Sequence, residues 1–125
     1  KRAPPIMVEN CHWGQVVPFQ PTATWCPFHM YRVGGDVRAK YASVMKHLQD
    51  IDSYAQQNLS RPGCWAYLDM LVVGIKQSGP HPEDPGLSAV ETTTHFAAWA
   101  ILSSPLILSL DVNDENVMDA VWDVI

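Results

Sequence analysis

The sequence has no long hydrophobic run and no cluster of basic residues. The apolar run that begins at Phe96 is interrupted by Ser103, Ser104 and Pro105, far short of the roughly 20 residues that a membrane helix needs. Lysine and arginine number 8 against 13 aspartate and glutamate residues, for a formal charge of −5, so the positive patch that attracts nucleic acid is missing. We therefore expect no membrane span, no nucleic-acid partner and no binding to anionic membrane surfaces.

Cysteine is scarce, and its spacing fits no thiol-rich site. The three residues, Cys11, Cys26 and Cys64, include no CxxC pair, which argues against a zinc site or a thioredoxin-like centre. Cys11 and Cys26 lie 15 positions apart, and this spacing alone leaves a disulfide and two free buried thiols equally open. Asn58-Leu59-Ser60 fits the N-glycosylation pattern. A disulfide and a glycan together would favour a secreted or endomembrane protein.

The residues that are present suffice for one packed domain. The chain has 125 residues, of which 47% are hydrophobic, with five Trp, four Tyr and three Phe. This composition excludes a disordered chain, and the length is too short for two domains. The first five residues include neither a Met nor an apolar signal segment, so we interpret the start as the interior of a longer precursor or a processed end.

Hydrophobic patterning predicts strands that alternate with helices. Short apolar runs predict buried strands at 6–8, 65–73 and 106–110. Apolar periodicity and a capping-box sequence predict helices at 37–57, 88–102 and 117–124. Proline-rich loops are predicted at 11–27 and 76–87. The alternation is typical of parallel βα units in an α/β fold, and three or four such units are half of an eight-stranded barrel, which needs at least about 200 residues.

Polar residues lie where the strands of such a fold would end. Ligands of parallel α/β folds bind at the carboxyl ends of the strands. The residues at these positions are Glu9, Asn10, His12, Arg32, Asp36, Asp69 and Asp111. Carboxylates beside one arginine, with three tryptophans nearby in the sequence, suit a carbohydrate ligand, and cleavage of a glycoside needs two carboxyl groups.

Each of these residues also has a structural interpretation. Asp36 lies where the N-cap of the helix at 37–57 is expected, and Asp111 suits a cap or a loop. His12 suits a loop, and His95 suits a surface or packed position on a helix. Asp69 lies inside an apolar run, where a carboxylate is costly unless it is paired or functional.

Several segments, in chain order, resemble glycoside hydrolase family 27, which includes many α-galactosidases. Residues 61–71 (RPGCWAYLDML) are similar to the GPGGWNDPDML signature of that family. Residues 11–14 (CHWG) resemble its Cys-Glu-Trp segment, and residues 31–37 (YRVGGDV) resemble its W-R-x-x-x-D-I motif. The similarity continues, into the helix after the seventh barrel strand and the eighth strand, at 95–100, 104–108 and 110–112.

The resemblance implies the C-terminal half, about strands five to eight, of a (β/α)8 TIM barrel. Residues 1–125 would be a partial glycosidase barrel domain without its upstream half and without the C-terminal β-sandwich of the family. It implies a retaining hydrolase of terminal α-D-galactosides that needs no metal or organic cofactor, in a secreted, lysosomal or vacuolar location. Its partners would be a galactoside or related sugar and the remaining half of the barrel, and the resemblance leaves a homo-oligomer open.

The same resemblance assigns roles to individual residues. Asp36 would be the general acid/base, and Cys11 would pair with Cys26. Cys64 would pair with an upstream cysteine outside this chain or stay free. The predicted substrate-binding residues are His12, Trp13, Gln15, Arg32, Asp69 and Met70. Of these, His12 and Gln15 would read the substituent at sugar C2.

Departures from the family pattern keep other functions open. The family's nucleophilic Asp, in a Lys-x-Asp strand before this region, has no counterpart, so the chain alone is expected to be inactive. His12, Tyr67 and Leu68 replace an acidic residue, an Asp and a Pro of the pattern. These changes leave open a glycosidase for β-L-arabinopyranosides or α-N-acetylgalactosaminides, and a non-catalytic structural or sugar-binding relative in an extracellular assembly.

Overall fold

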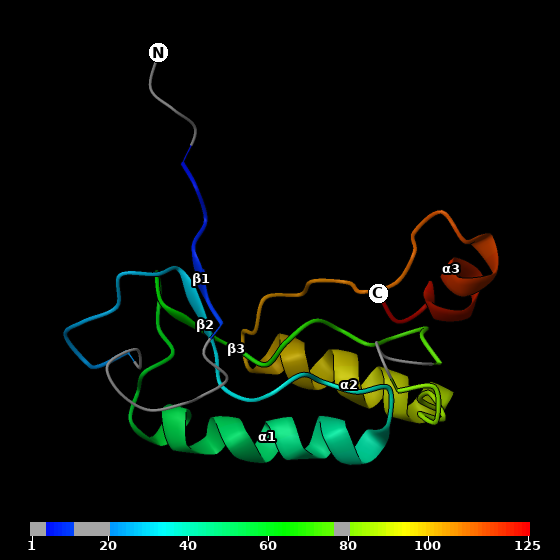
Figure 1. Cartoon of the computed structure of the whole chain (residues 1–125), viewed down its shortest axis with the longest axis horizontal. Helices are drawn as coiled ribbons and strands as arrows, with labels where there is room; N and C mark the ends of the chain where they lie inside the picture. The colour runs from blue at the N-terminus through cyan, green and yellow to red at the C-terminus, as the bar shows by residue number, and fades with distance from the viewer. Residues whose placement is uncertain (1–4, 12–20, 77–80) are drawn as a thin grey trace.

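The computed structural model describes residues 5–11, 21–76 and 81–125 and has an α/β fold with a parallel three-stranded sheet (Figure 1). The strands, adjacent in chain order, are β1 (Glu9–Asn10), β2 (Met30–Arg32) and β3 (Trp65–Tyr67). The helices are α1 (Tyr41–Gln56), α2 (Ala89–Ile101) and α3 (Glu115–Val121). The predicted α/β class is confirmed, and a parallel sheet of this kind fits a fragment of the predicted barrel.

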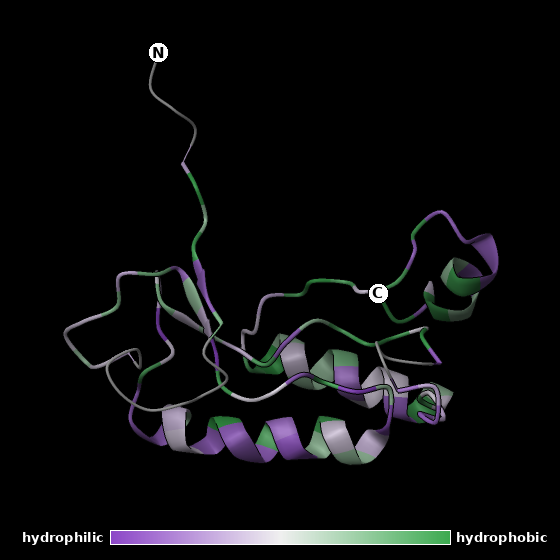
Figure 2. Cartoon of the chain, in the orientation of Figure 1, coloured by the Kyte–Doolittle hydropathy of each residue, from purple (hydrophilic) through white to green (hydrophobic). Residues whose placement is uncertain are grey.

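The two longer helices lie side by side on one side of the sheet, whereas α3 lies apart near the C-terminus (Figure 1). Hydrophilic and hydrophobic residues alternate along α1 (Figure 2). Its buried residues, Val44, His47, Ile51 and Tyr54, recur at intervals of three and four, which places them on one face of the helix. The apolar residues of this face form the core together with Trp99 of α2 and with buried residues of β2 and β3.

The disulfide of the structure joins Cys26 to Cys64, with the Cα atoms 6.2 Å apart, and Cys11 is free and exposed. The predicted Cys11–Cys26 pair is therefore wrong, as are both predictions for Cys64. The reason is the direction of the strands. Cys26 and Cys64 precede β2 and β3 and so lie at the edge where parallel strands start, whereas Cys11 follows β1 at the opposite edge.

The strands are shorter than predicted. Residues 6–8 are not a buried strand, because Ile6 is 77% exposed. Val8 bonds to the residue before β2: its carbonyl accepts from His29 N–H (2.9 Å), and its N–H donates to His29 Nδ1 (3.0 Å). The strand predicted at 65–73 ends at Tyr67, just before Asp69, whose φ is 94°. The strand predicted at 106–110 is one bridge between Leu71 and Leu108.

The helix predicted from residue 37 begins at Tyr41, and its N-cap is Lys40, which provides no side-chain cap. The interpretation of Asp36 as the N-cap is therefore wrong. The backbone of residues 38–39 makes other hydrogen bonds than those of a helix: Arg38 N–H donates to Ser43 Oγ (2.9 Å), and the Ala39 carbonyl accepts from Gly86 N–H (2.9 Å). The capping box that predicts the start of α2 is confirmed: Ser88 and Glu91 exchange hydrogen bonds.

Within the described ranges, no helix has the length and apolarity needed to cross a membrane. The same residues contain no group of three or more His, Cys, Asp or Glu side chains placed to hold a metal ion.

Candidate active site

Arg32, the last residue of β2, is the centre of a charged group at the carboxyl ends of the strands. Its buried guanidinium lies 3.2 Å (Nη2) from Asp36 Oδ1 and 2.9 Å from Asp69 Oδ2. Nη2 also donates to the Gly35 carbonyl, and Nη1 lies 3.7 Å from Cys11 Sγ. The structure therefore brings together the end of β2 and the residues that follow all three strands.

The two carboxylates that flank Arg32 are in opposite environments. The side chain of Asp36 is 74% exposed, whereas that of Asp69 is only 9% exposed. Asp36 follows two glycines on the connection from β2 to α1. Its Oδ1 atom contacts Arg32, and most of its side chain is exposed to solvent. An exposed carboxylate beside a buried cation can exchange a proton with a ligand and can bind a hydroxyl group.

Asp69 is bound on several sides by protein groups. Its Oδ2 accepts from Val37 N–H (2.8 Å) and its Oδ1 from Met70 N–H (2.8 Å). Its carbonyl oxygen accepts from the indole N–H of Trp99 (2.8 Å). The predicted need for a partner is thus met by two backbone N–H groups and Arg32, and the neighbouring Met70 is exposed.

His47 on α1 also reaches this connection and was not among the predicted site residues. Its Nε2 lies 2.8 Å from the Gly35 carbonyl oxygen and its Nδ1 lies 2.8 Å from the Ser43 carbonyl oxygen. A Cβ atom at Gly34 would lie 3.0 Å from Asp50 Oδ2, so the segment before Asp36 packs closely against α1. The available signal was the position of His47, three residues after Val44 and four before Ile51 on the apolar face of the predicted helix.

Burial and the charge of Arg32 shift the pKa values of the side chains around it. Burial raises the pKa of Glu9 at β1, and the charge of Arg32 opposes that effect. Burial also raises the pKa of Tyr67, whose ring centroid lies 6.0 Å from the Arg32 guanidinium carbon. Tyr67, which departs from the family signature, is therefore a buried neutral residue beneath Arg32.

The other predicted residues lie away from the Arg32 group or outside the residues that the structure describes. His12, Trp13 and Gln15 lie outside the described residues. Asn58 is exposed at the end of α1 with a φ of 53°. It precedes β3, and so it lies toward the edge opposite Arg32.

His95 and Asp111 have structural roles. His95 is a fully buried side chain of α2, which accepts from Val72 N–H (3.0 Å) and meets the Trp99 ring edge-on at 4.1 Å. Of its two predicted positions, the packed one is confirmed. Asp111 accepts from Asn113 N–H (2.9 Å) in the loop before α3.

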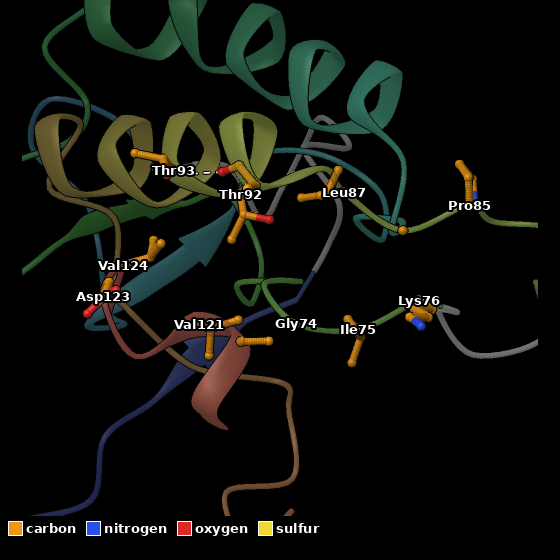
Figure 3. A pocket seen from close by; sticks show the side chains of 13 residues that line it. Gly74, Ile75, Lys76, Pro85, Leu87, Thr92, Thr93, Val121, Asp123 and Val124 are labelled. Carbon is orange, nitrogen blue, oxygen red and sulfur yellow. Dashed lines mark hydrogen bonds between the residues drawn. The ribbon is translucent and has the colours of Figure 1, made fainter. Parts of the chain in front are cut away.

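A separate cavity of about 450 Å³ lies between the start of α2 and α3. In Figure 3, Thr92 of α2 faces it from one side and Val121 of α3 from the other, near Gly74. Its charged lining residues are Lys76 and Asp123. None of the lining residues belongs to the Arg32 group.

Comparison with known proteins agrees with the sequence motifs. The family model described as "Alpha galactosidase A" (Melibiase_2) matches residues 5–121. A protein of Aspergillus terreus named "Probable alpha-galactosidase D" is 37% identical over 112 residues, which are 88% of this chain and 15% of that protein. The alpha-galactosidase D of Emericella nidulans is 35% identical over 103 residues, which are 81% of this chain and 14% of that protein.

The chain thus spans about 15% of the length of the curated relatives it matches. The family match covers most of the chain and includes the residues around Arg32. The predicted resemblance is confirmed, and the chain belongs to the alpha galactosidase A (Melibiase_2) family.

Proposed function

We propose that this chain supplies the acid/base half of the active site of a retaining glycoside hydrolase for terminal α-D-galactosides. The observation that carries the proposal is the exposed Asp36 carboxylate, 3.2 Å from the buried Arg32 at the carboxyl ends of parallel strands. Membership of the family and relatives named alpha-galactosidase D support the substrate class.

In this proposal Asp36 protonates the glycosidic oxygen as the leaving group departs and then removes a proton from the attacking water. Arg32 holds one oxygen of Asp36 and leaves the exposed side of the carboxylate toward the sugar. The nucleophilic carboxylate belongs to a part of the barrel outside this chain, so the chain alone is inactive. No metal or organic cofactor takes part.

The sugar pocket is completed by residues that the family resemblance assigns. Arg32 and Met70 would contact the sugar, and the resemblance places Asp69 there as well. His12, Trp13 and Gln15 would line the same pocket, where His12 and Gln15 meet the substituent at C2.

The remaining half of the barrel is the proposed partner of this chain. Apolar side chains are exposed at both borders of the sheet: Ile6 is 77% exposed before β1, and Leu106 is 48% exposed beside the Leu71–Leu108 bridge. Both segments are hydrophobic in Figure 2. Further strands at these two borders would cover them and close the sheet.

A secreted, lysosomal or vacuolar location and glycosylation of Asn58 belong to the same proposal. The disulfide supports an oxidising compartment, and the exposure of Asn58 at the end of α1 suits a glycan acceptor. A homo-oligomer is compatible with these features.

Replacement of Asp36 tests the proposed function. In the full-length natural protein, Asp36→Asn is expected to abolish turnover of an aryl α-galactoside with a poor leaving group and to leave the melting temperature near that of the parent. Asp111→Asn, which changes another exposed carboxylate, is the matched control and is expected to keep full activity. Near-normal turnover by Asp36→Asn would contradict the proposal.

A panel of aryl glycosides separates the alternative sugars. His12 motivates tests of β-L-arabinopyranosides and α-N-acetylgalactosaminides, because it replaces an acidic residue of the family. Tyr67 motivates them less, since its ring is buried beneath Arg32. No turnover of any glycoside, together with binding of galactose, would instead favour a non-catalytic sugar-binding relative.

A further inference from the structure

Asp69 has little capacity left for a ligand. An ionised carboxylate offers about four acceptor positions, and three are directed at Val37 N–H, Met70 N–H and Arg32 Nη2. About one position is left, and with 9% of the side chain exposed a sugar hydroxyl has little access to it.

The partners of Asp69 include two groups that hold Asp36 in place. Val37 N–H belongs to the residue directly after Asp36, and its 2.8 Å bond to Asp69 Oδ2 fixes the backbone there. The same Nη2 atom of Arg32 contacts Asp69 Oδ2 at 2.9 Å and Asp36 Oδ1 at 3.2 Å. Loss of the Asp69 charge would therefore loosen the main chain and the side chain of Asp36 together.

Asp69 is itself fixed from the other side of the core. Its φ of 94° lies in a region that side chains other than glycine rarely adopt. Such a backbone persists only where its surroundings determine it, and the bond from the buried Trp99 indole to the Asp69 carbonyl is part of those surroundings. A strained residue held in this way occurs most often at functional sites.

We infer that Asp69 is a positioning residue, which sets the orientation of the Asp36 carboxylate through Val37 N–H and Arg32 rather than by contact with the sugar. This inference rests on the proposed acid/base role of Asp36. It gives the buried carboxylate a function in proton transfer although no proton passes through it.

The leaving group distinguishes positioning of an acid from binding of a sugar. A poor phenol leaving group needs a proton from the general acid, whereas dinitrophenolate leaves without one. Loss of general acid catalysis typically costs about 10²- to 10⁴-fold, and that loss falls on poor leaving groups. A lost sugar contact instead weakens all substrates alike and weakens inhibition by free galactose.

The experiment compares Asp69→Asn with its parent in the full-length natural protein, using aryl α-galactosides with leaving groups of graded acidity. We expect kcat/KM to fall about tenfold or more for phenyl α-galactoside and less than threefold for the dinitrophenyl substrate. The inhibition constant of galactose should stay within twofold of the parent. Equal losses across the series, or galactose inhibition weakened in proportion, would overturn the inference.

Two further variants keep the result interpretable. Asp84→Asn changes another buried carboxylate, bonded to Arg38 on the same connection (3.0 Å), and should lower the melting temperature without changing the leaving-group dependence. If Asp69→Asn does not fold, Trp99→Phe removes the indole N–H that holds the Asp69 carbonyl and keeps an aromatic, though smaller, ring in the core. A smaller, selective loss on poor leaving groups is then expected, and a uniform loss would count against positioning.

Asp36→Asn, measured on the same series of substrates, separates a failure of the positioning role of Asp69 from a failure of the proposed function. A selective loss for Asp36→Asn without one for Asp69→Asn overturns the positioning role and leaves the proposed function standing. An Asp36→Asn variant without a selective loss overturns both.

Discussion

The Nε2 atom of His47 lies 2.8 Å from the carbonyl oxygen of Gly35, the residue before Asp36. Gly35 also accepts from Arg32, so a helix and a strand end hold the same peptide group. The second ring nitrogen of His47 faces the Ser43 carbonyl within α1. A single buried imidazole therefore joins the first half of α1 to the segment that carries the candidate acid.

Replacement of His47 by Leu should destabilise the protein while keeping the volume of the side chain nearly constant. The variant loses both polar contacts of a buried group, for which we expect a decrease of about 1–3 kcal/mol in the free energy of unfolding. Urea unfolding of the full-length natural protein measures it. His81→Ala, which removes a partly exposed histidine 3.3 Å from Glu83, should change stability by less than about 0.5 kcal/mol; equal effects would refute the difference.

Removal of the disulfide by Cys26→Ser and Cys64→Ser should lower stability by about 2–4 kcal/mol, because the bond closes a long loop in the unfolded chain. The bonded cysteines are 38 residues apart. Thermal unfolding with and without reductant measures the effect, and Cys11→Ser serves as the matched control with no expected change. A thiol assay on the intact protein should find Cys11 reactive among these three, and reactive Cys26 or Cys64 would contradict the pairing.

Stability should decrease below neutral pH through His95. Burial, and secondarily His47, lowers its pKa from 6.5 to about 4. The unfolded state therefore binds a proton between these two values that the folded state excludes. The neutral form thus contributes stability that is fully present above pH 6.5 and is lost progressively toward pH 4, on the order of 3 kcal/mol.

Urea unfolding at pH 7 and pH 5 measures this dependence. His95→Gln is the comparison, because its amide oxygen can accept from Val72 N–H and it does not titrate. The variant should be less stable at pH 7 and should lose less stability than the parent on going to pH 5. Parallel losses would show that other groups account for the acid sensitivity.

The helices were predictable from the sequence because their determinants are local. The Ser88–Glu91 capping box spans four residues and defines the start of α2. The apolar face of α1 follows from residues three and four apart. The start of α1 was predicted four residues too early, since contacts distant in sequence hold the segment before it: Asp69 binds Val37 across 32 residues, and Asp84 binds Arg38 across 46.

The sequence predicts which residues of the candidate site lie close together, but it does not predict their detailed arrangement. Arg32, Asp36 and Asp69 lie at one edge, as expected for residues that follow parallel strands. Their catalytic and binding roles stay predictions. The position of His47 on the apolar helix face predicts burial, but the same position suits a core histidine and a histidine that holds a loop, so its contact with Gly35 does not follow from the sequence.

The cysteine pairing could not be read from spacing, because it depends on the direction in which each strand runs through the sheet. The Cys26–Cys64 bond joins β2 and β3 where they start, and the Arg32–Asp69 ion pair joins them where they end. A strand that slipped by one residue would turn its side chains to the opposite face. With one covalent and one ionic tie at its two ends, this strand pair has a locked register, so the distance between Asp36 and Asp69 can change only by movement of the connecting segment and not by sliding of the sheet.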